Sequence, residues 1–397
     1  MDQRVIDAIK KGYFDIPFYQ DACAKAGMPL SEVCTQEQFL KIPFTVKDDL
    51  RNTSPYERTR TDPKDIFGLY SSSGTTGKKT FYIHSRADHE KQDAYSREFF
   101  TRAGLKAGDL GAIFGPIESP IMGHCMMWQF HAINVGVTLC PRPSPENILD
   151  VITQLPVTDI ATLPQIASFP AGRSEWRAAA KKSTVKRLLL GGDFISDVRR
   201  NVLEEVWDAE VFNCFGMSEI FGPIGIDCQE KNGFHYHDED IYLEIVSPET
   251  GLPVPVGEIG VGVYTTLWDK GFPLLRYWSG DLLRLVPEPC TCGCKLPRFD
   301  YFGRYDDCVK LPDGKWVSPR QMEEFTLKEK ILHCQLQIQQ DKSALFVYDK
   351  DGVAPSDQLL RQMRDLLEGA EVTAKPLPLC EINLRGLKPK YMLDTRG

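Results

Sequence analysis

The sequence predicts an α/β protein with a large multi-layer N-terminal domain, residues 1–303, and a small α+β C-terminal domain, residues 304–397. Three observations support this prediction. Short apolar strands alternate with amphipathic helices in the middle of the chain, Gly and Pro turns separate short strands from about residue 241, and the pattern changes again after Gly303. A chain of 397 residues is also long for a single domain.

The middle of the chain carries the strand and helix alternation. Four apolar segments are typical of buried strands: 109–114, 159–163, 185–190 and 210–213. The segments 145–155 and 197–208 are typical of helices, since apolar residues such as Ile148 and Ile152 recur at helical spacing. The alternation predicts a layered sheet whose ligands bind at the carboxyl ends of the strands.

The last hundred residues follow a different pattern. Apolar side chains alternate from Leu332 to Ile338, and 344–348 can supply the second strand of a hairpin. Ser356 is placed to cap a helix that ends at Gly369. These elements predict a separate small unit, with the boundary near 303–307.

Charge and composition exclude several classes of function. The formal net charge is −8 and no stretch is strongly basic, which argues against nucleic-acid or anionic-membrane binding. The N-terminus lacks the apolar core of a signal peptide and no long apolar run follows, so we expect a soluble cytoplasmic protein. The twelve cysteines are then expected to be thiols or metal ligands.

The most distinctive local motif is SSSGTTGKKT at 71–80, which follows an apolar strand at 66–70. Two glycines allow a tight turn that exposes N–H groups, while six hydroxyls and two lysines add donors and positive charge. Such a loop can hold a polyphosphate. It is not a Walker loop, because residue 72 is Ser and Lys78 is followed by Lys79. A flexible surface loop is the alternative.

Further motifs follow this loop in the order found in one enzyme superfamily. They are Gly191–Asp193, Phe215–Glu219, Arg276–Asp281, and Gly303–Asp307 followed by Lys310 and Gly314. With the phosphate loop, they make the chain similar to the acyl-adenylate-forming superfamily, which includes acyl-CoA synthetases and nonribosomal adenylation domains. The resemblance implies a mobile small domain on a hinge.

Two segments narrow the resemblance to one branch. The N-terminal segment 17–51 and the run Cys290–Gly293 are similar to the phenylacetate–coenzyme A ligase branch. The resemblance then extends from about residue 17 to the C-terminus. It implies a ligase that uses ATP, Mg²⁺ and coenzyme A.

The resemblance also implies roles for single residues. Glu219 would hold magnesium, Ser218 would contact the α-phosphate, and Asp306 would be the hinge. The remaining nucleotide contacts would be Ser72, Ser73, Gly74, Thr75, Thr76, Gly77 and Lys78 in the loop, Gly192 and Asp193 at the adenine, Phe215, Gly216 and Met217 in the next motif, and Asp281 and Arg304 at the ribose. The alternative for Asp281 and Arg304 is that each belongs to an ordinary surface ion pair.

A catalytic lysine is expected near the C-terminus. Alignment on Asp394 places Lys388 at the family's catalytic position. Leu387 stands where the family has Gly and Tyr391 where it has Arg, so Lys390 is a rival. A compact cation there would bridge carboxylate and α-phosphate oxygens, and a solvated tail lysine is the alternative.

Cysteine and histidine residues form a second constellation. Cys228, His235, Cys290 and Cys292 resemble the zinc site of some members of the branch, and four protein ligands would make the zinc structural. Cys294 could replace one cysteine, and His237 could replace His235. Reduced cysteines in a tight turn are the alternative.

The leading functional hypothesis is adenylation of an aromatic or arylacetic acid followed by transfer to coenzyme A. The acid pocket is expected to involve 117–130 and 215–225. Transfer to an amine or to a carrier-protein thiol is the runner-up, and a catalytically silent homologue is a third reading. The acid is not identified by the sequence, and a homodimer is compatible with it.

Overall fold

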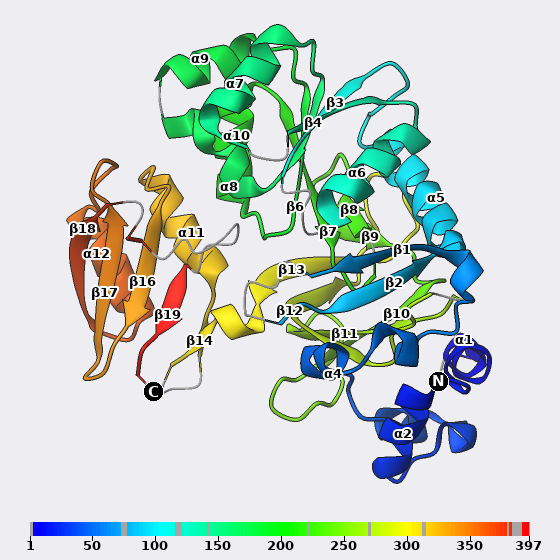
Figure 1. The fold of residues 1–397 in the computed structure, drawn as a ribbon. Helices are drawn as coiled ribbons and strands as arrows, with labels where there is room; N and C mark the ends of the chain where they lie inside the picture. Colours follow the sequence, from blue (N-terminus) through cyan, green and yellow to red (C-terminus); the bar gives the residue numbers. More distant parts are fainter. Residues whose placement is uncertain are drawn as a thin grey trace. The chain divides into compact units, whose positions relative to one another are not determined.

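The computed structural model describes residues 3–72, 78–115, 121–140, 143–172, 174–220, 222–268, 271–311, 315–378, 381–382 and 391–396 (Figure 1). The chain divides into two compact units. The first comprises Met1–Thr162, Ser183–Gly192 and Phe212–Tyr301, and the second comprises Leu163–Lys182, Asp193–Val211 and Phe302–Gly397. The second unit therefore includes two segments from the middle of the sequence. The predicted domain boundary between residues 303 and 304 stays a prediction.

The described residues form one large sheet with the strand order β10-β11-β12-β13-β9-β8-β7-β6-β5-β3-β4. Its strands are β3 (Leu110–Phe114), β4 (Gly136–Cys140), β5 (Asp159–Thr162), β6 (Arg187–Gly191), β7 (Glu210–Gly216), β8 (Pro223–Asp227), β9 (Phe234–Tyr236), β10 (Ile241–Val246), β11 (Gly260–Thr266), β12 (Tyr277–Val286) and β13 (Arg298–Arg304). β4, β3, β5 and β6 pair in parallel, whereas β7–β8, β8–β9 and β10–β11 pair antiparallel. The four strands predicted in the middle of the chain are confirmed.

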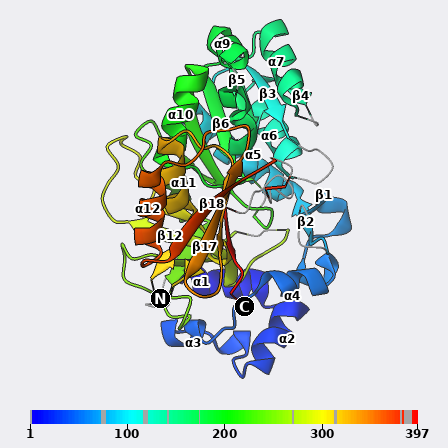
Figure 2. The same cartoon turned by 90° about the vertical axis from the view of Figure 1, so that its left-hand side faces the viewer.

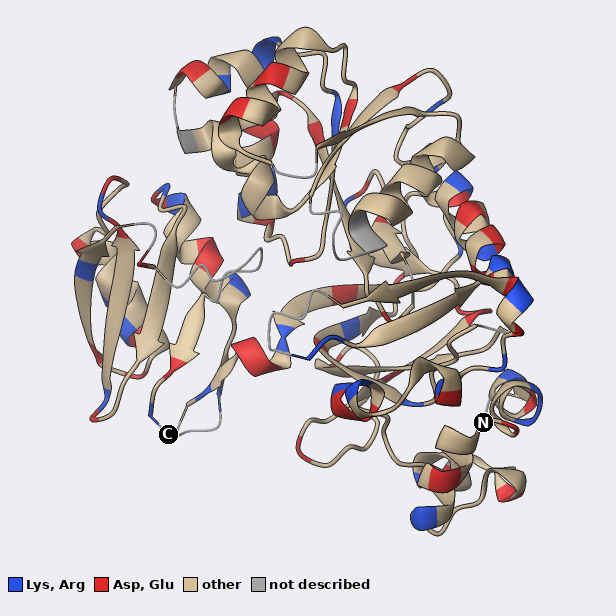
Figure 3. Ribbon diagram, in the orientation of Figure 1, with Lys and Arg blue, Asp and Glu red and all other residues tan. Residues whose placement is uncertain are grey.

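Helices and a two-stranded sheet complete the first unit. The helices are α1 (Gln3–Ala8), α2 (Pro17–Lys25), α3 (Gln36–Leu40), α4 (Lys47–Asn52), α5 (Arg86–Arg102), α6 (Ile121–Ala132) and α7 (Pro145–Gln154), and the strands are β1 (Ile66–Ser71) and β2 (Phe81–Ser85). α5 begins where Ser85 and Asp88 cap each other's backbone N–H groups, and acidic and basic residues are interspersed along it (Figure 3). The predicted helix at 145–155 is confirmed by α7.

A buried ion-pair network joins three parallel strands at their amino ends. Arg187, which begins β6, donates to Asp159 of β5 at 2.5 Å and to Asp109 at 2.6 Å, and it also donates to the Gly104 carbonyl at 2.8 Å. Both carboxylates are buried. Because each charge has a partner, the network holds these strands in register without leaving an unpaired ion.

The second unit contains a smaller sheet with the order β18-β17-β16-β19. Its elements are α8 (Pro164–Ala167), α9 (Ser174–Lys182), α10 (Asp197–Trp207), β14 (Val309–Lys310), β15 (Trp316–Val317), α11 (Pro319–Lys328), β16 (Cys334–Ile338), β17 (Ser343–Asp349), α12 (Asp357–Leu366), β18 (Glu371–Leu377) and β19 (Met392–Asp394). The predicted hairpin is confirmed by the antiparallel pair β16–β17, and β18 runs parallel beside β17 (Figure 2).

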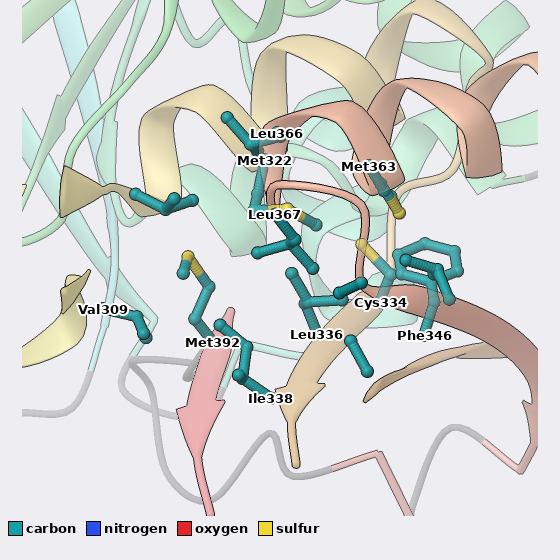
Figure 4. Packing of buried hydrophobic residues seen from close by; sticks show 14 of the residues in the cluster. Val309, Met322, Cys334, Leu336, Ile338, Phe346, Met363, Leu366, Leu367 and Met392 are labelled. Carbon is teal, nitrogen blue, oxygen red and sulfur yellow. The ribbon is translucent and has the colours of Figure 1, made fainter. Parts of the chain in front are cut away.

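An apolar core stabilises this sheet. Met322 of α11 and Met363 of α12 pack with Leu336 and Phe346 of the strands (Figure 4). Ser356 directly precedes α12, and its hydroxyl accepts from the Leu359 N–H, which caps the helix as the sequence predicts. None of the helices in the described part of the chain combines the length and the apolar character that a membrane span requires.

Candidate active site

A buried carboxylate ends the motif Phe215–Glu219, which begins in β7. Glu219 is 4% exposed, and its Oε1 accepts hydrogen bonds from Tyr277 Oη at 2.9 Å and from Tyr82 Oη at 3.1 Å. Lys47 Nζ, at the start of α4, lies 3.7 Å from the same oxygen. Three elements, β12, β2 and α4, therefore converge on one carboxylate.

These neighbours decide the charge of Glu219. Burial by itself raises the pKa of the carboxyl group, but the Lys47 charge and the hydrogen bonds from Tyr277 and Tyr82 outweigh it, so the pKa is lowered. Burial raises the pKa of Tyr82 far above its usual value, which keeps its hydroxyl a donor. Glu219 is consequently a carboxylate at neutral pH, and a carboxylate oxygen is a ligand that magnesium uses.

The residues just before Glu219 form a closely packed turn. Phe215 is buried and packs edge-on against Phe299 and Tyr301, with ring centroids 5.0 and 5.1 Å apart. A Cβ on Gly216 would lie 2.5 Å from the Gly222 carbonyl oxygen, so only glycine fits there. Met217 packs partly against the same aromatic cluster, and Ser218 is half-buried in the turn.

The ends of the predicted phosphate loop are joined. Ser72 N donates to the Thr80 carbonyl at 2.9 Å, and Thr80 N donates to Ser72 Oγ at 3.1 Å. Ser72 and Thr80 are buried, whereas Lys78 is exposed. The predicted contacts Ser73, Gly74, Thr75, Thr76 and Gly77 lie outside the described residues.

The other nucleotide residues predicted in the first unit follow strand ends or lie in a strand. Gly192 directly follows β6 with φ of +82°, a conformation that favours glycine. A Cβ on its neighbour Gly191 would lie 2.9 Å from the Cys214 carbonyl, so this turn is packed against β7 beside Phe215. Asp281 is buried in β12, where its N–H donates to Ser279 Oγ at 3.0 Å.

Three predicted residues belong to the second unit. Asp193 accepts a hydrogen bond from Gln165 and caps the Phe194 N–H at 2.9 Å. Arg304 and Asp306 form a partly exposed ion pair of 3.8 Å. Lys388 and Lys390 lie outside the described residues, so their roles stay predictions.

A cluster of sulfur and nitrogen atoms lies elsewhere in the first unit. One donor atom from each of Cys228, His235, Cys290 and Cys292 lies within 4.8 Å of the others. The Sγ atoms of Cys228 and Cys290 are 3.6 Å apart, and Cys292 Sγ is 3.4 Å from His235 Nε2. Tetrahedral zinc, with bonds of about 2.0–2.3 Å, places its ligand atoms at roughly these separations.

The rival ligands are engaged in other contacts. His237 stacks on Tyr95 with centroids 4.2 Å apart and approaches Glu98 at 3.2 Å, whereas Cys294 Sγ lies 2.5 Å from Arg102. His235 Nδ1 lies 3.1 Å from the Leu296 carbonyl, so an Nδ1–H donor there leaves Nε2 for a metal. The geometry brings together the first four residues and not these two.

A family model for AMP-binding enzymes matches residues 20–264, which is more than half of the chain. The chain belongs to the AMP-binding enzyme family. Phenylacetate–coenzyme A ligases from Thermus thermophilus and Escherichia coli K12 are 28% and 25% identical to it, over 86% and 85% of this chain and 78% of each relative. The predicted likeness to the phenylacetate–coenzyme A ligase branch is thereby confirmed.

Solved structures of CoA ligases share the fold. A structure of 2-hydroxyisobutyryl-CoA ligase in the postadenylation state matches with a TM-score of 0.84 and 19% identity, covering 99% of this chain and 88% of the other. A structure of an anthranilate CoA ligase matches with a TM-score of 0.58 and 16% identity over 80% and 64%. The predicted α/β fold of the adenylate-forming type is confirmed.

Sequence reasoning missed three residues at the carboxylate of this AMP-binding enzyme. Lys47 and Tyr277 lie in segments that the resemblance used, yet neither was assigned a role, and Tyr82 lies just beyond the phosphate loop. The sequence could have indicated Tyr277, since this residue belongs to the predicted nucleotide-binding segment that ends at Asp281. Nothing local indicated that Lys47 approaches Glu219, because the two residues are far apart in the sequence and only the fold brings them together.

Proposed function

We propose that this AMP-binding enzyme is an ATP-dependent, AMP-forming ligase that joins an aromatic or arylacetic acid to coenzyme A. One observation carries the proposal: four phenylacetate–coenzyme A ligases, 25–28% identical, match 83–86% of the chain. The buried, ionised Glu219 in the motif Phe215–Glu219 supports an adenylating site.

The reaction has two steps. A carboxylate oxygen of the acid bonds to the α-phosphorus of ATP while the bond to pyrophosphate breaks, which leaves an acyl-adenylate. The thiolate of coenzyme A then bonds to the acyl carbon while the bond to AMP breaks. Because two anions must meet in the first step, the site needs cations and oriented donors.

The chain can supply these groups. Glu219 would hold Mg²⁺, which neutralises phosphate charge when bound. Tyr277 and Tyr82 fix the Glu219 carboxylate through their hydroxyls. Ser218 would donate to the α-phosphate, and the joined ends of the phosphate loop would hold Lys78 near the polyphosphate.

The remaining nucleotide contacts extend the proposal. Asp281 would accept hydrogen bonds from the ribose hydroxyls, with Arg304 as a further donor. Gly192, Asp193 and Phe215 would border the adenine. Asp306 would be the hinge, and a C-terminal lysine, Lys388 or Lys390, would bridge the reacting oxygens.

We also propose that Cys228, His235, Cys290 and Cys292 bind one structural zinc ion. Three thiols and an imidazole are a donor set that zinc prefers, and no fifth position is needed. The ion would tie β8 and β9 to the loop before β13. A cytoplasmic location and a homodimer stay predictions, which cell fractionation and sedimentation equilibrium can test.

Acid-dependent ATP–pyrophosphate exchange, with Mg²⁺ and no acceptor, tests the first step across aryl, arylacetic, fatty and amino acids. We expect exchange with aryl or arylacetic acids. Mass spectrometry after adding coenzyme A, an amine or a carrier-protein thiol then identifies the acceptor, and we expect the thioester of coenzyme A. The absence of exchange with every acid from folded, zinc-loaded protein would refute the proposal.

A further inference from the structure

Three polar side-chain atoms converge on the backbone of Gly222, which precedes β8. A Cβ on Gly222 would lie 2.6 Å from Gln92 Oε1, 2.8 Å from Gln129 Nε2 and 2.9 Å from Cys125 Sγ. Gln92 comes from α5, whereas Cys125 and Gln129 come from α6. Gly222 has φ of +98°, so the backbone here also favours glycine. The two helices therefore direct polar groups at one point.

The two glutamine amides are buried without adequate partners. Gln92 is 3% exposed and Gln129 is 1% exposed. Within the described part of the chain, Gln92 Oε1 and both amide atoms of Gln129 make no well-aligned hydrogen bond. Leaving a buried polar atom unpaired costs about 1–3 kcal/mol, and native structures pair the large majority of buried side-chain polar atoms. A polar group from outside the chain can complete them.

The thiol beside them does not supply that partner. Burial raises the pKa of the Cys125 thiol well above its usual value, so the group is neutral. A neutral thiol is a weak donor and a weak acceptor. The Cys125 thiol is therefore at most a weak hydrogen-bond partner for the Gln129 amide.

Aromatic rings lie around this polar point. Tyr70 and Trp128 pack against Cys125, and their ring centroids are 6.2 Å apart at 80°. Phe67 meets Trp128 edge-on at 4.9 Å and stacks on His89 at 4.0 Å. Flat apolar surfaces beside two amides suit a planar ring that carries a hydrogen-bonding substituent.

The cluster also adjoins the motif that ends at Glu219. Gly216 packs on the Gly222 carbonyl, and Gly216 pairs with Pro223 in the β7–β8 ladder. The polar point is therefore next to the turn that would hold the acyl-adenylate. An acid whose carboxylate reached this turn could place the far end of its ring near α5 and α6.

On the basis of the proposed ligase function, we propose that Gln92 and Gln129 select an aromatic acid bearing a hydroxyl or amino substituent on its ring. An amide oxygen accepts a hydrogen bond and an amide nitrogen donates one. A hydroxyl group can donate to the oxygen and accept from the nitrogen. An unsubstituted ring would leave buried amide atoms unpaired, which disfavours it. The substrate class is thus a polar-substituted aryl or arylacetic acid rather than phenylacetic acid itself.

Matched acid pairs test this selection by ATP–pyrophosphate exchange. Phenylacetate is compared with 3- and 4-hydroxyphenylacetate and with their amino counterparts, and benzoate is compared with its hydroxy and amino derivatives. We expect kcat/KM for one substituted acid to exceed that of its unsubstituted partner by at least about ten-fold. An unsubstituted acid that performs as well as every substituted one would overturn the proposal.

Two variants test whether the side-chain amides of Gln92 and Gln129 select the substituted acid. Gln92→Met and Gln129→Met keep side-chain length and remove the hydrogen-bonding groups. Each should lower kcat/KM for the substituted acid about ten-fold while leaving the unsubstituted partner unchanged or improved. Ile152→Val, a buried change in α7 and outside the expected acid pocket, should affect both acids alike. Equal losses on both acids in the glutamine variants would indicate a purely structural role, with the amides satisfied by water.

A measurement of binding tests this proposal about substrate selection independently of the proposed ligase activity. If no acid supports exchange, the ligase function fails, and calorimetry with non-reactive acyl-sulfamoyl adenosines still tests the selection. Wild-type protein should bind the hydroxyphenylacetyl analogue at least about ten-fold more tightly than the phenylacetyl analogue, and Gln129→Met should abolish the difference. Equal affinities in the wild-type protein would overturn the inference.

Discussion

Tyr277 donates a 2.9 Å hydrogen bond to Glu219, and both side chains are buried. The tyrosine comes from β12 and the carboxylate from the turn after β7, so the bond joins two of the predicted nucleotide-binding segments. Together with Tyr82 and Lys47 it keeps Glu219 ionised in spite of its burial. The position and the charge of this carboxylate thus depend on residues far from it in sequence.

Replacing Tyr277 with phenylalanine should therefore weaken both folding and adenylation. A hydrogen bond to a charged group is worth about 1.5–3 kcal/mol, and urea unfolding at pH 7 should show a loss in that range. The rate of ATP–pyrophosphate exchange should fall about ten-fold, because the carboxylate is held less firmly. Tyr56→Phe, at a residue that is 57% exposed, is the control and should match the wild type. A Tyr277→Phe protein with wild-type stability and exchange would refute this account of Glu219.

The site formed by Cys228, His235, Cys290 and Cys292 gives a prediction about the metal content of the protein. Protein purified without chelator should contain about one zinc ion per chain by plasma mass spectrometry, and Cys228→Ser should lose it. Chelation should lower the thermal midpoint of the wild type, because zinc binding is coupled to folding. Cys34→Ser, at an exposed cysteine outside the cluster, should keep both zinc and midpoint. Zinc retained in full by Cys228→Ser would exclude the proposed ligand set.

The Arg187 network predicts a large stability effect far from the candidate site. Arg187→Leu would leave Asp109 and Asp159 buried without their cation, and breaking such a pair costs about 3–5 kcal/mol. Urea unfolding measures the loss. Lys41→Leu, which breaks the exposed pair between Lys41 and Glu37, should leave the midpoint unchanged. Similar effects from the two changes would mean that the buried network contributes little.

Elements with strong local signals were predictable from the sequence. α12 combines a serine cap with apolar residues at helical spacing, and β3 and β5 are short apolar runs between turns. The resemblance to the zinc site of some members of the branch likewise included the four residues that the fold brings together, with Cys294 and His237 as alternatives. In each case the information lies within a few residues of the element itself or in a recognisable resemblance.

Contacts between distant segments were not predictable in this way. Arg276 begins a predicted nucleotide motif, yet it is buried, pairs with Glu244 at 3.0 Å and donates to the Leu40 and Ile42 carbonyls. The convergence of Gln92 and Gln129 on Gly222 was also unforeseen. Both depend on strand order and helix packing, which local periodicity does not specify.

His333 predicts a pH dependence of stability in the second unit. Burial and the nearby Arg199 charge lower its pKa, with Asp349 opposing them. A histidine in the unfolded chain has a pKa of about 6.5. Between this pKa and the lower pKa of the folded protein, the unfolded chain binds more protons than the folded one. The stability contributed by neutral His333 is complete above about pH 6.5 and is lost as the pH falls below it.

A variant isolates this contribution. The difference in unfolding free energy between the wild type and His333→Gln should be constant above about pH 6.5 and should shift against the wild type as the pH falls to 5. Chemical unfolding at several pH values measures it. Thr373→Ala, an exposed change in β18 of the same unit that removes no titratable group, should show no such trend. A difference independent of pH would show that His333 titrates alike in both states.

The choice between Lys388 and Lys390 is the sharpest test of the proposed chemistry. Asp394, on which the alignment rests, ends β19, and this strand pairs in parallel with β16 through Leu336 and Met392. Alignment from this fixed point favours Lys388, and a lost cation at a developing charge typically costs about 10²–10³ in rate. Lys388→Ala should reduce ATP–pyrophosphate exchange by that factor, whereas Lys390→Ala should reduce it less than about ten-fold. Lys375→Ala, at an exposed lysine of the same unit, is the control. The reverse order would assign the catalytic role to Lys390, and full activity in both variants would show that neither lysine bridges the reacting oxygens.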